Sequence, residues 1–191
     1  MHILRFFIDS DDFNIDFTFK SSFFLYFSKK INNYSMKKYI STDEALVKLQ
    51  KYCAFQERCH KEVRSKLLNL NIFGDDLESI ISTLIESGFL NEMRYATAFV
   101  RGKFKIKKWG KFKITRELKK NQISEYCIKK ALESEIPYED YLATLEDILK
   151  KKNKTLREKN SFKRNHKLAK FAESKGFESF LIWETLKDLK I

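Results

Sequence analysis

The residues best suited to chemistry in this chain are the cations of GFLNEMRYATAFVRGKFKIKKWGKFKITREL, from Gly88 to Leu118. Lysine and arginine side chains alternate there with Phe, Trp and Ile. Ammonium and guanidinium groups bind phosphates and acidic protein surfaces, and they also form the solvated faces of helical domains. The stretch is therefore either a binding surface for an acidic partner or a face that keeps the protein in solution.

The positive charge lies in the second half of the chain. The formal net charge is +12, yet residues 36–100 sum to zero. Residues 101–130 hold twelve cations and two anions, and residues 150–175 are net +9. Such blocks exceed what solubility requires, so we favour an acidic partner; the charge alone does not choose among nucleic acid, an anionic membrane and an acidic protein.

Residues suited to catalysis or metal binding are few and scattered. His2, His60 and His166 are isolated, and no nucleophile–base arrangement is visible. Cys53, Cys59 and His60 fit no standard zinc spacing and lack a fourth ligand. There is no P-loop and no dinucleotide-binding glycine motif. We therefore expect no enzyme, no metal and no cofactor.

Composition favours a helical, cytoplasmic protein. Pro occurs once and Gly five times, and these are too few turn-forming residues for an architecture of strands and turns. Three cysteines form no disulfide framework, as suits a reducing compartment. No apolar run approaches the roughly 20 residues that span a bilayer, so we expect no membrane partner.

Residues 1–35 differ from the rest of the chain. They contain eight of the 18 phenylalanines and no helical period, and Met36 is followed by a conventional bacterial start, KKYISTDEALVKL. We interpret residues 1–35 as a non-native or disordered extension from a misassigned start codon. A partly ordered segment that covers the first helices is the alternative.

Helix signals become dense from Ser41. STDE at 41–44 is a capping box, and Ala45, Leu46 and Leu49 follow at helical spacing. DDLESIISTLIESG begins with an acidic cap and ends at Gly88, a typical residue after a helix C-terminus. Further on, the stretch around residues 96–104 places its apolar side chains on one stripe, so Ala96, Phe99, Val100 and Phe104 are predicted core residues.

The apolar pattern recurs with a period near 50 residues. The second copy lies 51 residues after the first, and a weaker third copy lies another 54 residues on. This period predicts an all-α, elongated array of three tandem three-helix repeats, at residues 36–89, 90–136 and 137–191. The recurring positions are Val63, Leu67, Ile72, Leu77, Ile80 and Ile81; then Ile114, Leu118, Ile123, Ile128, Ala131 and Leu132; then Leu168, Ala172, Phe177, Ile182, Thr185 and Leu186.

Two motifs at the right separation resemble the RecX family, bacterial regulators of the RecA recombinase. They are GFLNEMRYATAFV at 88–100 and WGKFKITRELKKNQIS at 109–124. One departure is Gln122, where the family usually has the glycine of a turn; we expect Asn121 to supply the left-handed residue instead. The matching motif residues are Gly88, Leu90, Asn91, Arg94, Tyr95, Ala96, Gly110, Ile114, Leu118 and Ile123.

The resemblance implies a cytoplasmic, monomeric regulator that acts in DNA repair and the SOS response. Its partner would be the RecA–single-stranded DNA filament, with double-stranded DNA left open, and binding along the filament groove would suppress ATP hydrolysis, strand exchange and co-protease activity. On that hypothesis the first contact block is Arg101, Lys103, Lys105, Lys107, Lys108, Lys111, Lys113, Arg116, Lys119 and Lys120. The second block is Lys150, Lys151, Lys152, Lys154, Arg157, Lys163, Arg164 and Lys167.

Several alternatives stay open at this point. A helical protein that binds nucleic acid without sequence preference needs no recombinase partner, and an adaptor could use its charge for solubility alone. Trp109, beside the Gly110 where its helix should stop, is either a residue that packs repeats together or an exposed contact. Arg94 and Tyr95 are equally open between packing and contact.

Overall fold

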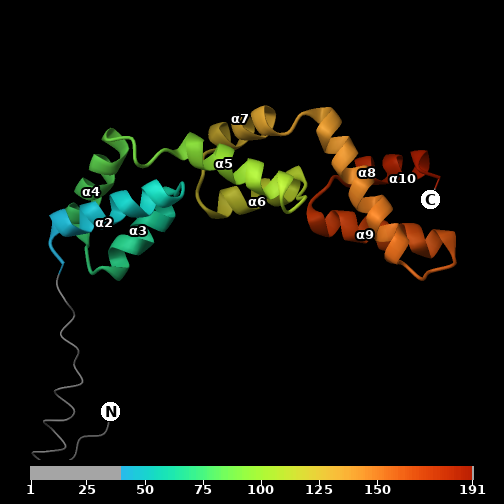
Figure 1. Cartoon of the computed structure of the whole chain (residues 1–191), viewed down its shortest axis with the longest axis horizontal. Coiled ribbons are helices and arrows are strands. Elements are labelled where there is room, and N and C mark those ends of the chain that lie inside the picture. The colour runs from blue at the N-terminus through green and yellow to red at the C-terminus, as the bar shows by residue number, and fades with distance from the viewer. Residues whose placement is uncertain (1–39, 191) are drawn as a thin grey trace, which may run out of the picture. The chain divides into compact units, whose positions relative to one another are not determined.

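The computed structural model describes residues 40–190, and all regular structure within them is helical (Figure 1). Residues 1–35, interpreted above as an extension, lie outside that range. No helix within residues 40–190 is both long and apolar enough to cross a membrane. The helices are α2 (Thr42–Phe55), α3 (His60–Asn69), α4 (Gly74–Glu86), α5 (Glu92–Lys105), α6 (Lys111–Lys120), α7 (Glu125–Glu135), α8 (Tyr138–Thr155), α9 (Ser161–Lys175) and α10 (Ser179–Asp188).

Helix packing divides the chain into three consecutive groups. Helices α2, α3 and α4 pack on one another, α5 packs on α6 and α7, and α8 packs on α9 and α10. The predicted array of three-helix repeats is thereby confirmed. The predicted boundaries at 89/90 and 136/137 fall in the α4–α5 and α7–α8 connections; we retain them as the proposed limits of the repeats.

The recurring apolar positions are the core of each repeat. Every one of the positions predicted from the 50-residue period is buried except Leu132, which is partly buried against the same core. In α5, Ala96, Val100 and Phe104 are buried and Phe99 is partly buried, as the helical stripe predicts. Burial of these side chains on one face of each helix is the main force that holds the repeats together.

Side-chain caps fix where several helices begin. The Ser41 hydroxyl accepts a hydrogen bond from the Glu44 amide (3.2 Å), which confirms half of the predicted capping box. The acidic cap predicted for α4 is wrong, because Phe73 is the N-cap residue and makes no side-chain cap. Asp75 and Asp76 lie in the first turn instead, where their charge favours the positive end of the helix dipole.

A left-handed residue ends the second helix of each repeat at the same place. Asn71 (φ 60°), Gln122 (φ 61°) and Gly176 (φ 94°) occupy equivalent positions, 51 and 54 residues apart. In each case the next residue is a core residue whose amide bonds to a carbonyl five positions back, which closes a Schellman motif. These bonds are Ile72–Leu67 (3.1 Å), Ile123–Leu118 (3.1 Å) and Phe177–Ala172 (3.2 Å).

The prediction that Asn121 supplies the left-handed residue is wrong. Asn121 has φ −84°, and Gln122 adopts the left-handed conformation without being glycine. The register explains this, because the left-handed residue must directly precede Ile123 for that side chain to turn back into the core. The Asn121 side chain has another role, since its amide donates to the Tyr95 hydroxyl (3.0 Å).

The second and third repeats share one hydrophobic core, whereas most buried residues of the first repeat form a separate cluster. At the shared boundary the backbones of Gly110 and Gly176 touch. The Gly110 amide donates to the Lys175 carbonyl (2.9 Å), and the Phe112 amide donates to the Gly176 carbonyl (3.1 Å). A Cβ atom on Gly110 would overlap the backbone of Gly176 and Phe177. Only glycine therefore permits this approach.

Tyr141 of α8 completes the boundary. Its ring stacks on Phe177 with centroids 4.9 Å apart, and its hydroxyl donates to a Glu178 carboxylate oxygen (2.6 Å) while accepting from the Lys111 amide (3.0 Å). Burial, together with the bond to Glu178, raises the pKa of the Tyr141 phenol far above its usual range. The phenol thus stays a neutral donor that links α6, α8 and the start of α10.

The left-handed turn generates a stability prediction. Gln122→Gly should raise the free energy of unfolding by about 0.5–1 kcal/mol, because relief of about 1–2 kcal/mol of left-handed strain outweighs the added entropy of the unfolded chain. Thermal unfolding of the full chain would measure it. Asn71→Gly is the matched control and should gain less, since Asn tolerates this conformation better. An unchanged or lower midpoint for Gln122→Gly would contradict the account.

The glycine contact generates a second prediction. Gly110→Ala should lower the free energy of unfolding by about 1–3 kcal/mol, because the backbones must separate and lose their hydrogen bonds. Gly102→Ala on α5 is the control. Nothing lies within 4 Å of its would-be Cβ atom, so it should be neutral or stabilise by up to about 1 kcal/mol. Equal effects of the two substitutions would show that the contact is unimportant.

Candidate functional site

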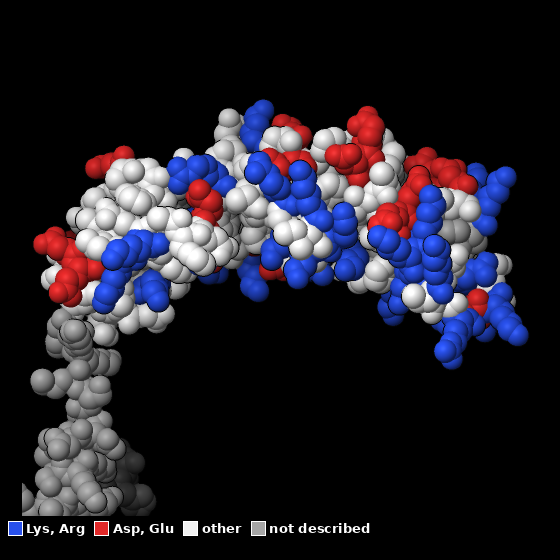
Figure 2. Space-filling model, viewed as in Figure 1, with Lys and Arg blue, Asp and Glu red and all other residues white. Residues whose placement is uncertain are grey.

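The first predicted contact block lies on the second half of α5, the connection that follows it, and α6. Figure 2 shows Lys and Arg gathered over this part of the chain and over α8 and α9, while acids and cations are mixed over the first repeat. Within the block, Arg101, Lys105, Lys107, Arg116, Lys119 and Lys120 are exposed, and Lys103, Lys108, Lys111 and Lys113 are partly buried.

Several of these cations are held by groups of the protein itself. Arg101 makes a two-point bond with Glu135 of α7 (2.8 and 2.7 Å), and Lys119 pairs with Glu125 (2.7 Å). Accordingly, the pKa of the Glu135 carboxyl is lowered by its hydrogen bond from Arg101, and that of Glu125 is lowered by Lys119. The charges of Arg101 and Lys119 are thus largely compensated within the fold.

Trp109 is a packing residue whose ring also holds two lysines. The indole is partly buried against the shared core of the second and third repeats. The Lys103 and Lys113 ammonium groups lie 5.0 and 4.7 Å from its ring centroid, within the range of cation–π attraction. Lys113 also donates to the Ser174 carbonyl (3.0 Å), and Lys111 lies 4.8 Å from the Tyr141 ring.

The remaining cations of the first block are available to a partner. Lys105, Lys107 and Lys120 are exposed, and none makes an ion pair or a ring contact through its ammonium group within residues 40–190. Lys108 is partly buried at a positive φ of 52°. Among the described residues, the only acid paired with Arg116 is its chain neighbour Glu117, at 3.9 Å. The structure thus divides a uniform run of lysines into held and available groups.

The second block divides in the same way. Lys150 and Lys151 pair with Glu146 and Asp147 one turn back (2.7 and 2.8 Å). Lys167 pairs with Glu158 (2.7 Å), and this bond lowers the pKa of the Glu158 carboxyl. The ammonium group of Lys152 lies 5.3 Å from the Phe171 ring.

On the α8–α9 side, the available cations cluster near the connection between those helices. Lys154, Arg157 and Lys163 are exposed and lack ion pairs within the described part of the chain. Arg164 is partly buried, and its Nε finds no acceptor there. These side chains extend the positive surface onto the third repeat.

The junction motif joins the first two repeats. Asn91 caps α5 by accepting from the Arg94 amide (2.9 Å), and Gly88 has the left-handed φ (72°) expected after α4. The Arg94 guanidinium bonds to Glu57 (2.9 Å) and to the Gly88 carbonyl (2.8 Å). Tyr95 is buried, and burial raises the pKa of its phenol well above the usual range.

The remaining motif residues also have structural roles. Gly110 makes the backbone contact with Gly176, and Leu90, Ala96, Ile114, Leu118 and Ile123 are buried in the cores. For Arg94 and Tyr95 the contacts favour packing over partner binding. The residues of the two sequence motifs therefore form the caps, cores and joints of the repeats.

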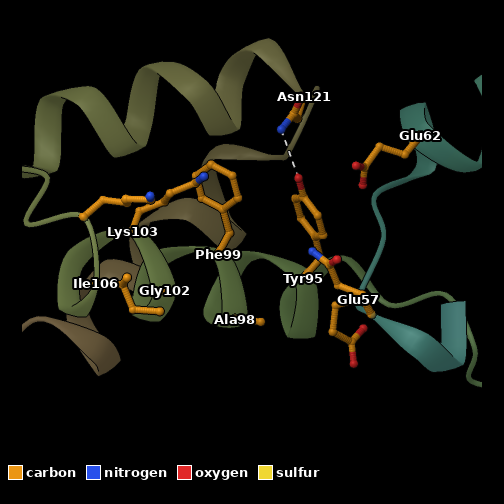
Figure 3. A pocket seen from close by; sticks show the side chains of 11 residues that line it. Glu57, Glu62, Tyr95, Ala98, Phe99, Gly102, Lys103, Ile106 and Asn121 are labelled. Atoms are coloured by element: carbon orange, nitrogen blue, oxygen red, sulfur yellow. Dashed lines mark hydrogen bonds between the residues drawn. The ribbon is translucent and has the colours of Figure 1, made fainter.

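A groove of about 550 Å³ lies between the first and second repeats (Figure 3). Glu57 and Glu62 line the side formed by the first repeat, while Phe99, Lys103 and Ile106 line the side formed by α5 and its end. Sequence reasoning missed it, because its walls come from segments some 40 residues apart. Ile106, exposed within a run of lysines, was the only local signal.

Metal-binding chemistry has no site in the described part of the chain. No group of three His, Cys, Asp or Glu side chains between residues 40 and 190 lies close enough to hold an ion. Cys53, Cys59 and Cys127 are free and buried. Burial raises the pKa of the Cys53 and Cys59 thiols, which disfavours the reactive thiolate.

Comparison with known proteins matches the repeats one by one. A family model described as RecX, second three-helix domain, matches residues 91–132, and one described as RecX, third three-helix domain, matches residues 139–186. A regulatory protein RecX from Caldanaerobacter subterraneus subsp. tengcongensis is 31% identical over 155 residues, which are 78% of this chain and 74% of the relative.

Two further relatives agree with this. A regulatory protein RecX from Pelodictyon phaeoclathratiforme is 29% identical over 117 residues, 61% of this chain and 71% of the relative. A crystal structure of RecX from Lactobacillus salivarius has the same fold, with a TM-score of 0.70 and 23% identity over 78% of this chain and 96% of that one. The domain matches, together with a relative 31% identical across more than two thirds of both chains, show that this chain belongs to the RecX family.

Proposed function

We propose that this protein binds a RecA-type recombinase filament on single-stranded DNA and suppresses its ATP hydrolysis, strand exchange and co-protease activity. Membership of a family of regulatory proteins supports the regulatory role. The available cations on α5–α6 and at the α8–α9 connection support contact with a polyanion, since side chains already paired within the fold have little charge left to offer.

The observation that carries the proposal is the concentration of net positive charge in the second and third repeats, which is +10 over residues 101–130 and +9 over residues 150–175. The same fold is built in the first repeat with a net charge of zero over residues 36–100. Folding of a three-helix repeat therefore does not need the excess charge. Its concentration on two repeats that share one core indicates a binding role.

The function predicts potent inhibition of the recombinase. ATP hydrolysis by the host RecA on single-stranded DNA would be measured while the full chain is added. Inhibition should occur at well below one molecule of this protein per recombinase monomer, because a protein bound along a filament affects several subunits. The control is a titration with the DNA concentration doubled. If the midpoint of inhibition instead rises with the DNA concentration, and is reached only when this protein saturates the DNA, the protein competes with RecA for phosphates. That result would support a nucleic-acid-binding protein without a recombinase partner.

The division of the lysines generates a second test. Lys105→Gln with Lys107→Gln should weaken binding to single-stranded DNA and make the slope of log affinity against log salt shallower by about 1.4, because each lost phosphate contact removes about 0.7. Fluorescence anisotropy with a labelled oligonucleotide at several salt concentrations would measure it.

The matched control changes the same charge in the first repeat. Lys48 and Lys51 are exposed on α2, so Lys48→Gln with Lys51→Gln changes the net charge equally without touching the proposed surface. It should leave the slope unchanged. An equal change in both double variants would mean that only the net charge matters, and the assignment of the surface to α5–α6 would be wrong.

A further inference from the structure

We propose that Phe162, His166 and Trp183 form a platform on which unpaired bases of single-stranded DNA stack. The inference rests on the proposed function in that it names a DNA-contacting surface for the same protein. It concerns residues of the third repeat that neither sequence motif contains.

The three rings form a continuous row across two helices. Phe162 and His166 lie one turn apart on α9, with centroids 4.5 Å apart and planes at 67°. His166 in turn lies 5.1 Å from the ring of Trp183 on α10, at 74°. These are edge-to-face contacts, which fix the orientation of each ring before any ligand arrives.

The row lies on the surface and is not part of the core. Phe162 is 71% exposed and Trp183 is 39% exposed, and His166 is also exposed. On the same helix, Leu168 and Ala172 are buried on a side turned away from His166. Neither Phe162 nor Trp183 belongs to the hydrophobic core of the second and third repeats, so packing of that core does not explain these exposed rings.

Cations accompany the row along α9. Lys163, Arg164, Lys167 and Lys170 alternate with the aromatic positions, and residues 150–175 carry a net charge of +9. Lys163 and Lys170 are exposed and make no ion pair within residues 40–190. Aromatic faces beside positive charges are the arrangement that holds single strands, since bases stack on the rings while the cations attract the phosphates.

Charge complementarity selects nucleic acid over other occupants. A second copy of this surface would bring two strongly positive faces together at low dielectric, which is unfavourable. Duplex DNA keeps its bases stacked inside and offers the rings no free π-face. A single strand supplies phosphates and open bases together, and single-stranded DNA is the strand that the proposed function requires.

The test uses the full chain and two ligands of equal phosphate number, a twenty-residue oligothymidylate and an abasic deoxyribose oligomer of the same length. The wild-type protein should prefer the oligothymidylate. Phe162→Ala should weaken that binding by about tenfold, as expected for loss of one stacked base, and leave the affinity for the abasic oligomer unchanged. Phe55→Ala removes an aromatic side chain that is 85% exposed in the first repeat, whose net charge is zero, and should change neither affinity.

A positional measurement accompanies the affinities. An oligonucleotide that carries 5-iododeoxyuridine should photocrosslink to peptides of α9 or α10, and Phe162→Ala should reduce that yield. Equal binding of both oligomers by the wild type, or crosslinks confined to other helices, would overturn the platform. Self-association, or binding to anionic phospholipid vesicles, would also overturn the platform if Phe162→Ala abolished it, because the rings would then bind another partner.

The outcome is separable from that of the proposed function, because these measurements contain no recombinase. Inhibition of the recombinase without a preference for bases would reject the platform alone. A preference for bases, lost in Phe162→Ala, without inhibition would reject the regulatory function alone.

Discussion

The close approach of Gly110 to Gly176 is the constraint on which the arrangement of the second and third repeats depends. Because neither residue has a side chain, two backbone hydrogen bonds form between α6 and the end of α9. Tyr141 then bonds to both sides of the contact. The core on either side becomes continuous, so the two positively charged repeats are joined by packing as well as by the chain.

The cations of the lysine-rich stretch fall into two groups, those held by other groups of the fold and those without such contacts. Residues that point toward aromatic rings or acids, such as Lys103, Lys113 and Arg101, stabilise the joints through cation–π contacts and ion pairs. Lys105 and Lys107 have no such partner within the described range, and under the proposed function they would neutralise phosphates and so release counterions condensed on the DNA. Sequence spacing does not make this division, since Arg101 and Lys105 lie one turn apart on α5 and only Arg101 pairs with an acid among the described residues, Glu135.

Much of the fold was predictable from sequence because the buried apolar residues recur at regular spacing, both within each helix and from repeat to repeat. Val63, Ile114 and Leu168 recur at equivalent places, and the repeats and their cores follow from that spacing. The turn was mispredicted, because residue type favoured Asn121 while the register of Ile123 required Gln122 to be left-handed. The groove beside Phe99 and the aromatic row that ends at Trp183 were not predictable. Each is formed by segments far apart in the sequence, and no local sequence pattern shows that these segments pack together.

The shared core also has a consequence for affinity. If the cations of α5–α6 and those beside α9 bind one strand, the second contact forms at high effective concentration, because the core has already fixed the distance between them. The entropy of ordering is then lost during folding and not during binding. Individually weak phosphate contacts can in this way give firm attachment that remains sensitive to salt. Under the proposed function, the joint made by the glycine backbones would therefore also set the spacing of the two charged surfaces.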